Sequence, residues 1–212
     1  MAFDLEEQEK IDELKAWWHR WGNLTSYGIA GVLVAAAGWQ WWQNHQVSQS
    51  IEASAVYDKL IQAVDAGDAR VAREAGGMLI DKYADTAYAT RAALMVAGIN
   101  LSQNDTKSAQ AQLEWAVEHT REGGLKDIAR LRLAAILLDQ KNYDAALTQL
   151  NAAHTDAFAP RFNDLKGDVL LAQGKTQDAK AAYDAAYQAL DEKSPMRPLV
   201  GLKLDALGGP AK

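Results

Sequence analysis

The chain has 212 residues, no cysteine and a formal net charge of −6, from 22 basic and 28 acidic side chains. The lack of cysteine excludes disulfide bonds, cysteine-ligated zinc and thiol catalysis, and the acidic balance lacks the basic excess of a nucleic-acid-binding protein. The length suffices for a short terminal segment and one domain with a core of its own.

Residues 1–22 are expected to form an amphipathic segment. Ile11, Leu14, Trp18 and Trp21 recur at helical spacing, and charged residues occupy most of the positions between them. A helix of this kind is typical of a membrane surface, here on the cytoplasmic side. The alternative is a disordered polar tail that ends in aromatic anchors.

Residues 23–42 are expected to form a single transmembrane helix. No charged residue occurs between Arg20 and Glu52, and six of the seven tryptophans lie near the two ends of this stretch. About 20 apolar residues cross a bilayer, and tryptophan is enriched at its interfaces. A buried helix of a soluble protein and a cleaved signal peptide are the alternatives. Against a signal peptide, a long segment that contains six acidic residues precedes the stretch.

The basic residues predict the orientation of this helix. Lys10, Lys15 and Arg20 precede it, and the next basic residue is Lys59. Because basic residues are retained on the cytoplasmic side, the N-terminus is expected in the cytoplasm and residues 43–212 on the opposite side of the membrane.

One face of the expected membrane helix consists of small residues, namely Gly28, Gly31, Ala35 and Gly38. Small side chains allow a second helix backbone to approach closely, so this face is a candidate packing surface for a partner helix. Glycine and alanine are common in all membrane helices. The alternative explanation is therefore that these small residues reflect ordinary membrane-helix composition and that no partner helix packs against them.

Residues 43–212 are expected to form an all-α domain. Its apolar-periodic segments are separated by short breaks rich in Asp, Asn, Thr and Gly, which cap helices and form turns. No segment shows the alternation of a strand. Because nothing breaks the helix at Trp42, the membrane helix is expected to continue into the first helix of the domain.

The domain also contains an internal repeat. The aligned alanines Ala72, Ala109, Ala146 and Ala179 are 37, 37 and 33 residues apart. The pattern resembles the tetratricopeptide repeat, a helix–turn–helix unit of about 34 residues that stacks into a solenoid, although every copy lacks the usual early tryptophan. The residues expected to pack the helix pairs are Ala97, Ala109, Ala134, Tyr143, Ala146, Ala153, Gly167, Ala179, Tyr183 and Ala186.

No catalytic, cofactor or metal site is expected. The four histidines are scattered and have no partner at metal-ligand spacing, and no glycine-rich phosphate loop is present. A repeat solenoid usually holds another polypeptide, so the sequence favours an interaction protein over an enzyme.

Three stretches of the chain together resemble one known family. They are Lys15-Ala16-Trp17-Trp18, Gly38-Trp39-Gln40-Trp41-Trp42 with the following Gln43–Gln46, and Ser54–Tyr57. With the repeat domain they are similar to the YfgM-type ancillary subunits of the bacterial Sec translocon. The resemblance implies a single-pass inner-membrane protein with a periplasmic repeat domain.

The same resemblance implies the partners: the SecYEG channel and a membrane-anchored periplasmic prolyl-isomerase-like chaperone. The chain would be a non-catalytic adaptor that assists the folding of secreted proteins. Two other functions are compatible with the residues, a chaperone that binds unfolded secreted clients directly and a scaffold for envelope or cell-wall assembly.

Overall fold

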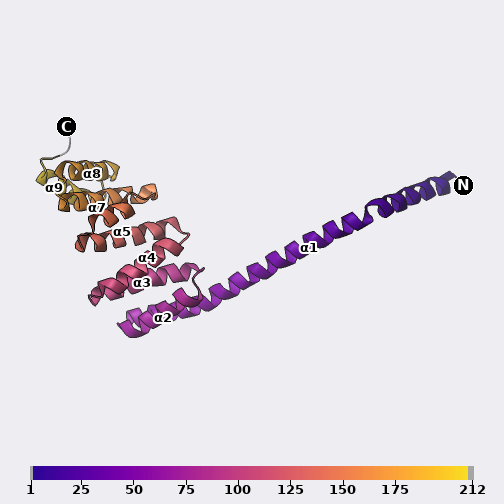
Figure 1. Ribbon diagram of the computed structural model, residues 1–212, viewed down its shortest axis with the longest axis horizontal. Coiled ribbons are helices and arrows are strands. Elements are labelled where there is room, and N and C mark those ends of the chain that lie inside the picture. Colours follow the sequence, from indigo (N-terminus) through magenta and orange to yellow (C-terminus); the bar gives the residue numbers. More distant parts are fainter. Residues whose placement is uncertain (1, 210–212) are drawn as a thin grey trace. The chain divides into compact units, whose positions relative to one another are not determined.

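The computed structural model of the chain describes residues 2–209, with side chains described from Lys10 onwards. All regular structure in this range is helical, which confirms the prediction of an all-α protein (Figure 1). The elements are α1 (Ala2–Asp65), α2 (Ala69–Lys82), α3 (Ala87–Ser102), α4 (Thr106–His119), α5 (Gly123–Asp139), α6 (Tyr143–Leu150), the short 3₁₀ helix η1 (Asp156–Phe158), α7 (Ala159–Ala172), α8 (Thr176–Ala189) and α9 (Arg197–Ala206).

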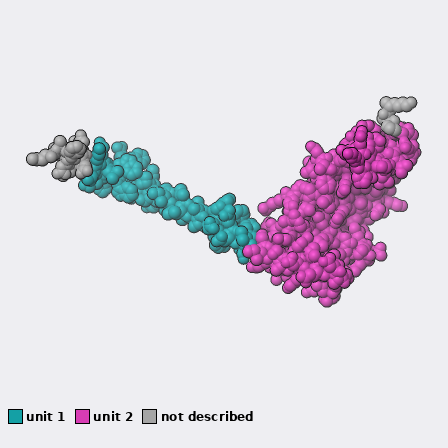
Figure 2. Space-filling view, turned by 180° about the vertical axis from the view of Figure 1, so that it is seen from behind, with its two compact units in different colours: residues 1–49 teal, residues 50–212 magenta. Residues whose placement is uncertain are grey.

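The chain divides into two compact units, residues 1–49 and residues 50–212 (Figure 2). In the first unit, every described residue belongs to α1. Large apolar side chains of this unit are exposed, including those of Trp18, Trp21, Val34 and Trp41. The second unit contains the end of α1 together with α2–α9 and holds the hydrophobic clusters of the protein.

The prediction of a transmembrane helix over residues 23–42 is wrong. Among the residues that the structure describes, no helix combines the length and the apolar character that crossing a membrane requires. The physical reason lies in the composition of the stretch, which is free of charge but rich in Gly, Ala and Trp and also contains Thr25, Ser26 and Gln40. Such residues gain far less free energy on transfer into lipid than Leu, Ile or Phe. The predicted orientation depended on this helix and therefore loses its basis.

Four turns of the second unit share one geometry and divide it into four helix pairs. The turn residue with positive φ is Gly67 (70°), Asn104 (60°), Lys141 (60°) or Gly174 (76°). In each turn the next amide donates to the carbonyl five residues earlier, as in the Asp105–Asn100 contact of 2.8 Å and the Asn142–Leu137 contact of 2.8 Å. This is the Schellman arrangement that closes a helix C-terminus. Because the turns recur at the spacing of the aligned alanines, the predicted repeat is confirmed, with four copies among the described residues.

Close contact between small and large side chains joins the helices of the second unit. Ala72, Ala109, Ala146 and Ala179 are fully buried, one in the second helix of each pair. In the fourth pair, Gly167 of α7 lies against the ring of Tyr183 of α8 so closely that a Cβ at position 167 would overlap the ring. The helix pairs therefore approach to distances that only alanine and glycine permit.

Helix α9 closes the C-terminal end of the repeats. Val200 and Leu204 are buried against α8, while Leu199 and Leu202 on the opposite side of α9 are exposed. Before it, the segment between α8 and α9 is held by Arg197, whose Nη1 donates to the Tyr187 carbonyl at 3.0 Å.

A charged cluster fastens α9 to α7. Lys203 Nζ donates to Asp164 Oδ1 at 2.7 Å and to Asp168 Oδ2 at 2.9 Å, and the Tyr183 hydroxyl donates to Asp168 Oδ1 at 2.7 Å. Burial acts to lower the pKa of Lys203, but its hydrogen bonds to both carboxylates outweigh burial and raise that pKa. The cluster thus favours the protonated ammonium.

Replacing Gly167 with alanine tests the close approach of α7 and α8. Gly167→Ala should lower the free energy of unfolding by about 1–3 kcal/mol, because the added methyl group must displace the buried Tyr183 ring. Gly98→Ala is the matched control, since a Cβ at this exposed α3 position meets nothing within 4 Å. It should stabilise the helix by about 0.5–1 kcal/mol. Similar urea-denaturation midpoints for the two variants would contradict this packing.

The turn geometry predicts the effect of glycine at Lys141. A non-glycine residue with φ of 60° is strained, so Lys141→Gly should raise the free energy of unfolding by about 0.5–1 kcal/mol. Asn104→Gly should change it less, because asparagine tolerates this conformation. A loss of stability in Lys141→Gly, measured by thermal denaturation, would exclude strain at this turn.

Removal of the Lys203 ammonium should loosen α9. Lys203→Met leaves two carboxylates of low exposure without their partner, and should cost about 1–3 kcal/mol at pH 7. Because folding raises the pKa of Lys203, this contribution is complete below the ordinary lysine pKa of about 10.4 and declines as the pH rises above it. The difference in urea denaturation between the variant and the unmodified chain should therefore be equal at pH 7 and pH 9.

Arg70→Met is the control for this measurement. Arg70 and Glu74 form an ion pair of 3.6 Å whose side chains are 77% and 70% exposed, so its loss should change stability by less than about 1 kcal/mol. A Lys203→Met variant as stable as Arg70→Met would show that the cluster does not fasten α9.

Candidate functional site

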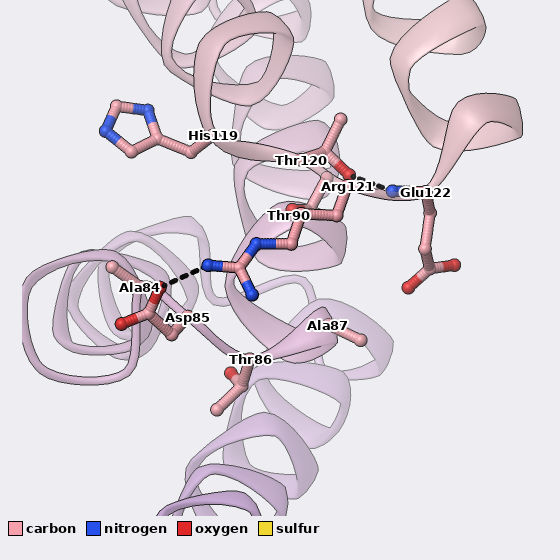
Figure 3. Close-up of a pocket in the computed structure, with 9 residues that line it drawn as sticks. All are labelled: Ala84, Asp85, Thr86, Ala87, Thr90, His119, Thr120, Arg121 and Glu122. Carbon is pink, nitrogen blue, oxygen red and sulfur yellow. Dashed lines mark hydrogen bonds and ion pairs between the residues drawn. The ribbon is translucent and has the colours of Figure 1, made fainter. Parts of the chain in front are cut away.

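A polar recess lies on the second unit where two turns between successive helix pairs meet (Figure 3). Its volume is about 200 Å³. We call it the turn recess. It is lined by Ala84, Asp85, Thr86, Ala87, Thr90, His119, Thr120, Arg121 and Glu122.

The repeat places the two sides of the turn recess together. One side is the α2–α3 turn with the start of α3, for which Thr86 is the N-cap residue in extended conformation. The other side is the end of α4 and the α4–α5 turn, where Glu122 is the N-cap residue of α5. Because α2–α3 and α4–α5 are equivalent connections of neighbouring repeats, stacking brings them to the same edge of the solenoid.

Two ion pairs balance the charge of the turn recess. The Arg121 side chain reaches across to Asp85, with 3.5 Å between Nη2 and Oδ1 (Figure 3). These two side chains are 84% and 78% exposed, so water screens the pair and it contributes little to stability. Arg91 forms a bidentate pair with Glu122, at 3.2 and 3.1 Å. Both carboxylates therefore have a cationic partner.

Three threonine side chains form the less exposed part of the lining. The Thr86 hydroxyl donates to the Tyr83 carbonyl at 2.7 Å, and Thr120 Oγ1 accepts from the Glu122 amide at 3.3 Å. Thr90 also lines the recess and is only 4% exposed. No side chain caps the first turn of α3. The lining of the recess is thus polar and combines hydroxyl groups with ion pairs.

His119 forms part of the wall of the turn recess. Its ring stacks on that of Trp115, with 4.5 Å between the ring centres, and its Nδ1 lies 2.9 Å from the Trp115 carbonyl. This contact fixes the imidazole at the end of α4.

The sequence-predicted packing residues lie mostly inside the repeats. Gly167 is buried, and Tyr143 is half-buried. Ala153 instead lies in the exposed segment between α6 and η1, where its carbonyl accepts a 2.6 Å hydrogen bond from Arg130 Nη1. The fully or almost fully buried members are Ala97, Ala109, Ala134, Ala146, Ala179, Tyr183 and Ala186.

The small-residue face of α1 is open. A Cβ added at Gly28, Gly31 or Gly38 would meet nothing within 4 Å, and Ala35 is exposed. Within the part of the chain that the structure describes, this face therefore packs against no other side chain.

Sequence reasoning missed the turn recess. Gly123 and Gly124 form the first turn of α5, and the connection before it is Thr120–Glu122. Thr90 belongs to no motif, since a lone threonine in an apolar helix is ordinary. The only available signal was the repeat spacing, which predicts that residues near 86 and 121 occupy equivalent turns.

Comparisons with known proteins agree with the repeat architecture. A family model described as a tetratricopeptide repeat-like domain matches residues 15–209. The ancillary SecYEG translocon subunit of Neisseria gonorrhoeae is 32% identical over 98% of this chain and the whole of the relative. The proteins of the same name from Haemophilus influenzae and Escherichia coli are 32% and 28% identical, over 89% and 95% of this chain and 92% and 96% of their own lengths.

These similarities cover both units of the chain and confirm the resemblance deduced from the sequence. The chain belongs to the family of ancillary SecYEG translocon subunits, which is built on a tetratricopeptide repeat-like domain.

Proposed function

We propose that this protein is a non-catalytic adaptor of the Sec translocon. The observation that carries the proposal is its similarity, along almost the whole chain, to proteins named ancillary SecYEG translocon subunits. Association with the translocon would bring the chain to the membrane. The adaptor would link the channel to periplasmic chaperones and assist the folding of secreted proteins.

The surfaces of both units support a role in binding other proteins. The first unit exposes many large apolar and aromatic side chains, and exposed apolar patches mark interaction sites. We propose that the face formed by Gly28, Gly31, Ala35 and Gly38 packs against a helix of the translocon, since small residues let helices approach closely. The second unit supplies a separate, repeat-built surface.

The periplasmic position of the second unit and its chaperone partner rest on the sequence resemblance. Such a partner, a membrane-anchored prolyl-isomerase-like chaperone, would meet secreted chains as they leave the channel. Two linked contacts also strengthen each other, because binding of one unit raises the effective concentration of the other.

Photocrosslinking from the full chain tests the adaptor function. A photoreactive residue at position 31 should capture a SecYEG subunit in membranes, and one at the exposed position 161 should capture the chaperone. In a chain with the photoreactive residue at a neighbouring position of α1, the double variant Gly31→Leu, Ala35→Leu should reduce capture of the SecYEG subunit, because the leucine side chains prevent close approach of a partner helix. Val32→Leu with Val34→Leu is the control, since it also ends in two leucines but at other exposed positions of α1.

The alternative functions predict different crosslinks. Capture of unfolded secreted chains without any SecYEG subunit would support a client-binding chaperone and contradict the adaptor. Capture of cell-wall synthases alone would support a scaffold for envelope assembly. If neither position captures a translocon subunit or a chaperone, although the variants accumulate and fold normally, the adaptor proposal is wrong.

A further inference from the structure

We draw no further inference here: the strongest candidate, the open groove between α7 and α8 beside Leu170, Ala182 and Ala185, is an unpartnered apolar face, and nothing in the described part of the structure shows what covers it.

Discussion

The second unit depends on helices that approach one another through alanine and glycine. Where a small residue faces a large one, as Gly167 faces Tyr183 and Gly76 faces Val96, the larger side chain fills the space that the smaller one leaves. Protein interiors are packed at the density of organic crystals, so neither partner tolerates a change of size. The Tyr183 hydroxyl also donates to Asp168 of the charged cluster. Packing of α7 against α8 therefore helps to position a carboxylate that binds Lys203 of α9.

Much of this fold could be predicted from the sequence because it repeats. The aligned alanines and the polar breaks predicted recurring helix pairs, and the structure supplies their number among the described residues, which is four. The turn at Lys141 was harder, since a lysine with positive φ carries no compositional signal. The transmembrane prediction failed for a different reason. The stretch after Arg20 has no charged side chain, but lack of charge is not the same property as strong hydrophobicity. Glycine, alanine and tryptophan make this stretch uncharged without making it apolar enough to cross a membrane.

The turn recess could not be predicted from the sequence, although every residue in it was visible. Its two halves, near Thr86 and near Arg121, lie about one repeat apart in the chain and form a recess only after stacking. Side chains that show no recognisable pattern in the sequence become neighbours in the folded structure. By contrast, Ala153 fitted the repeat alignment but lies in an exposed segment, because α6 ends at Leu150 and the chain passes through η1 before α7 begins.

The stacking of neighbouring helix pairs has a consequence for the rate and order of folding. Each pair contacts chiefly the next pair, so most contacts join residues close in sequence, and chain closure costs little entropy. Helical repeats of this kind can nucleate at any pair and extend outward. We expect the repeats to form one after another during synthesis, and opening of the native state to start at the terminal helix α9, which lies at the end of the stack.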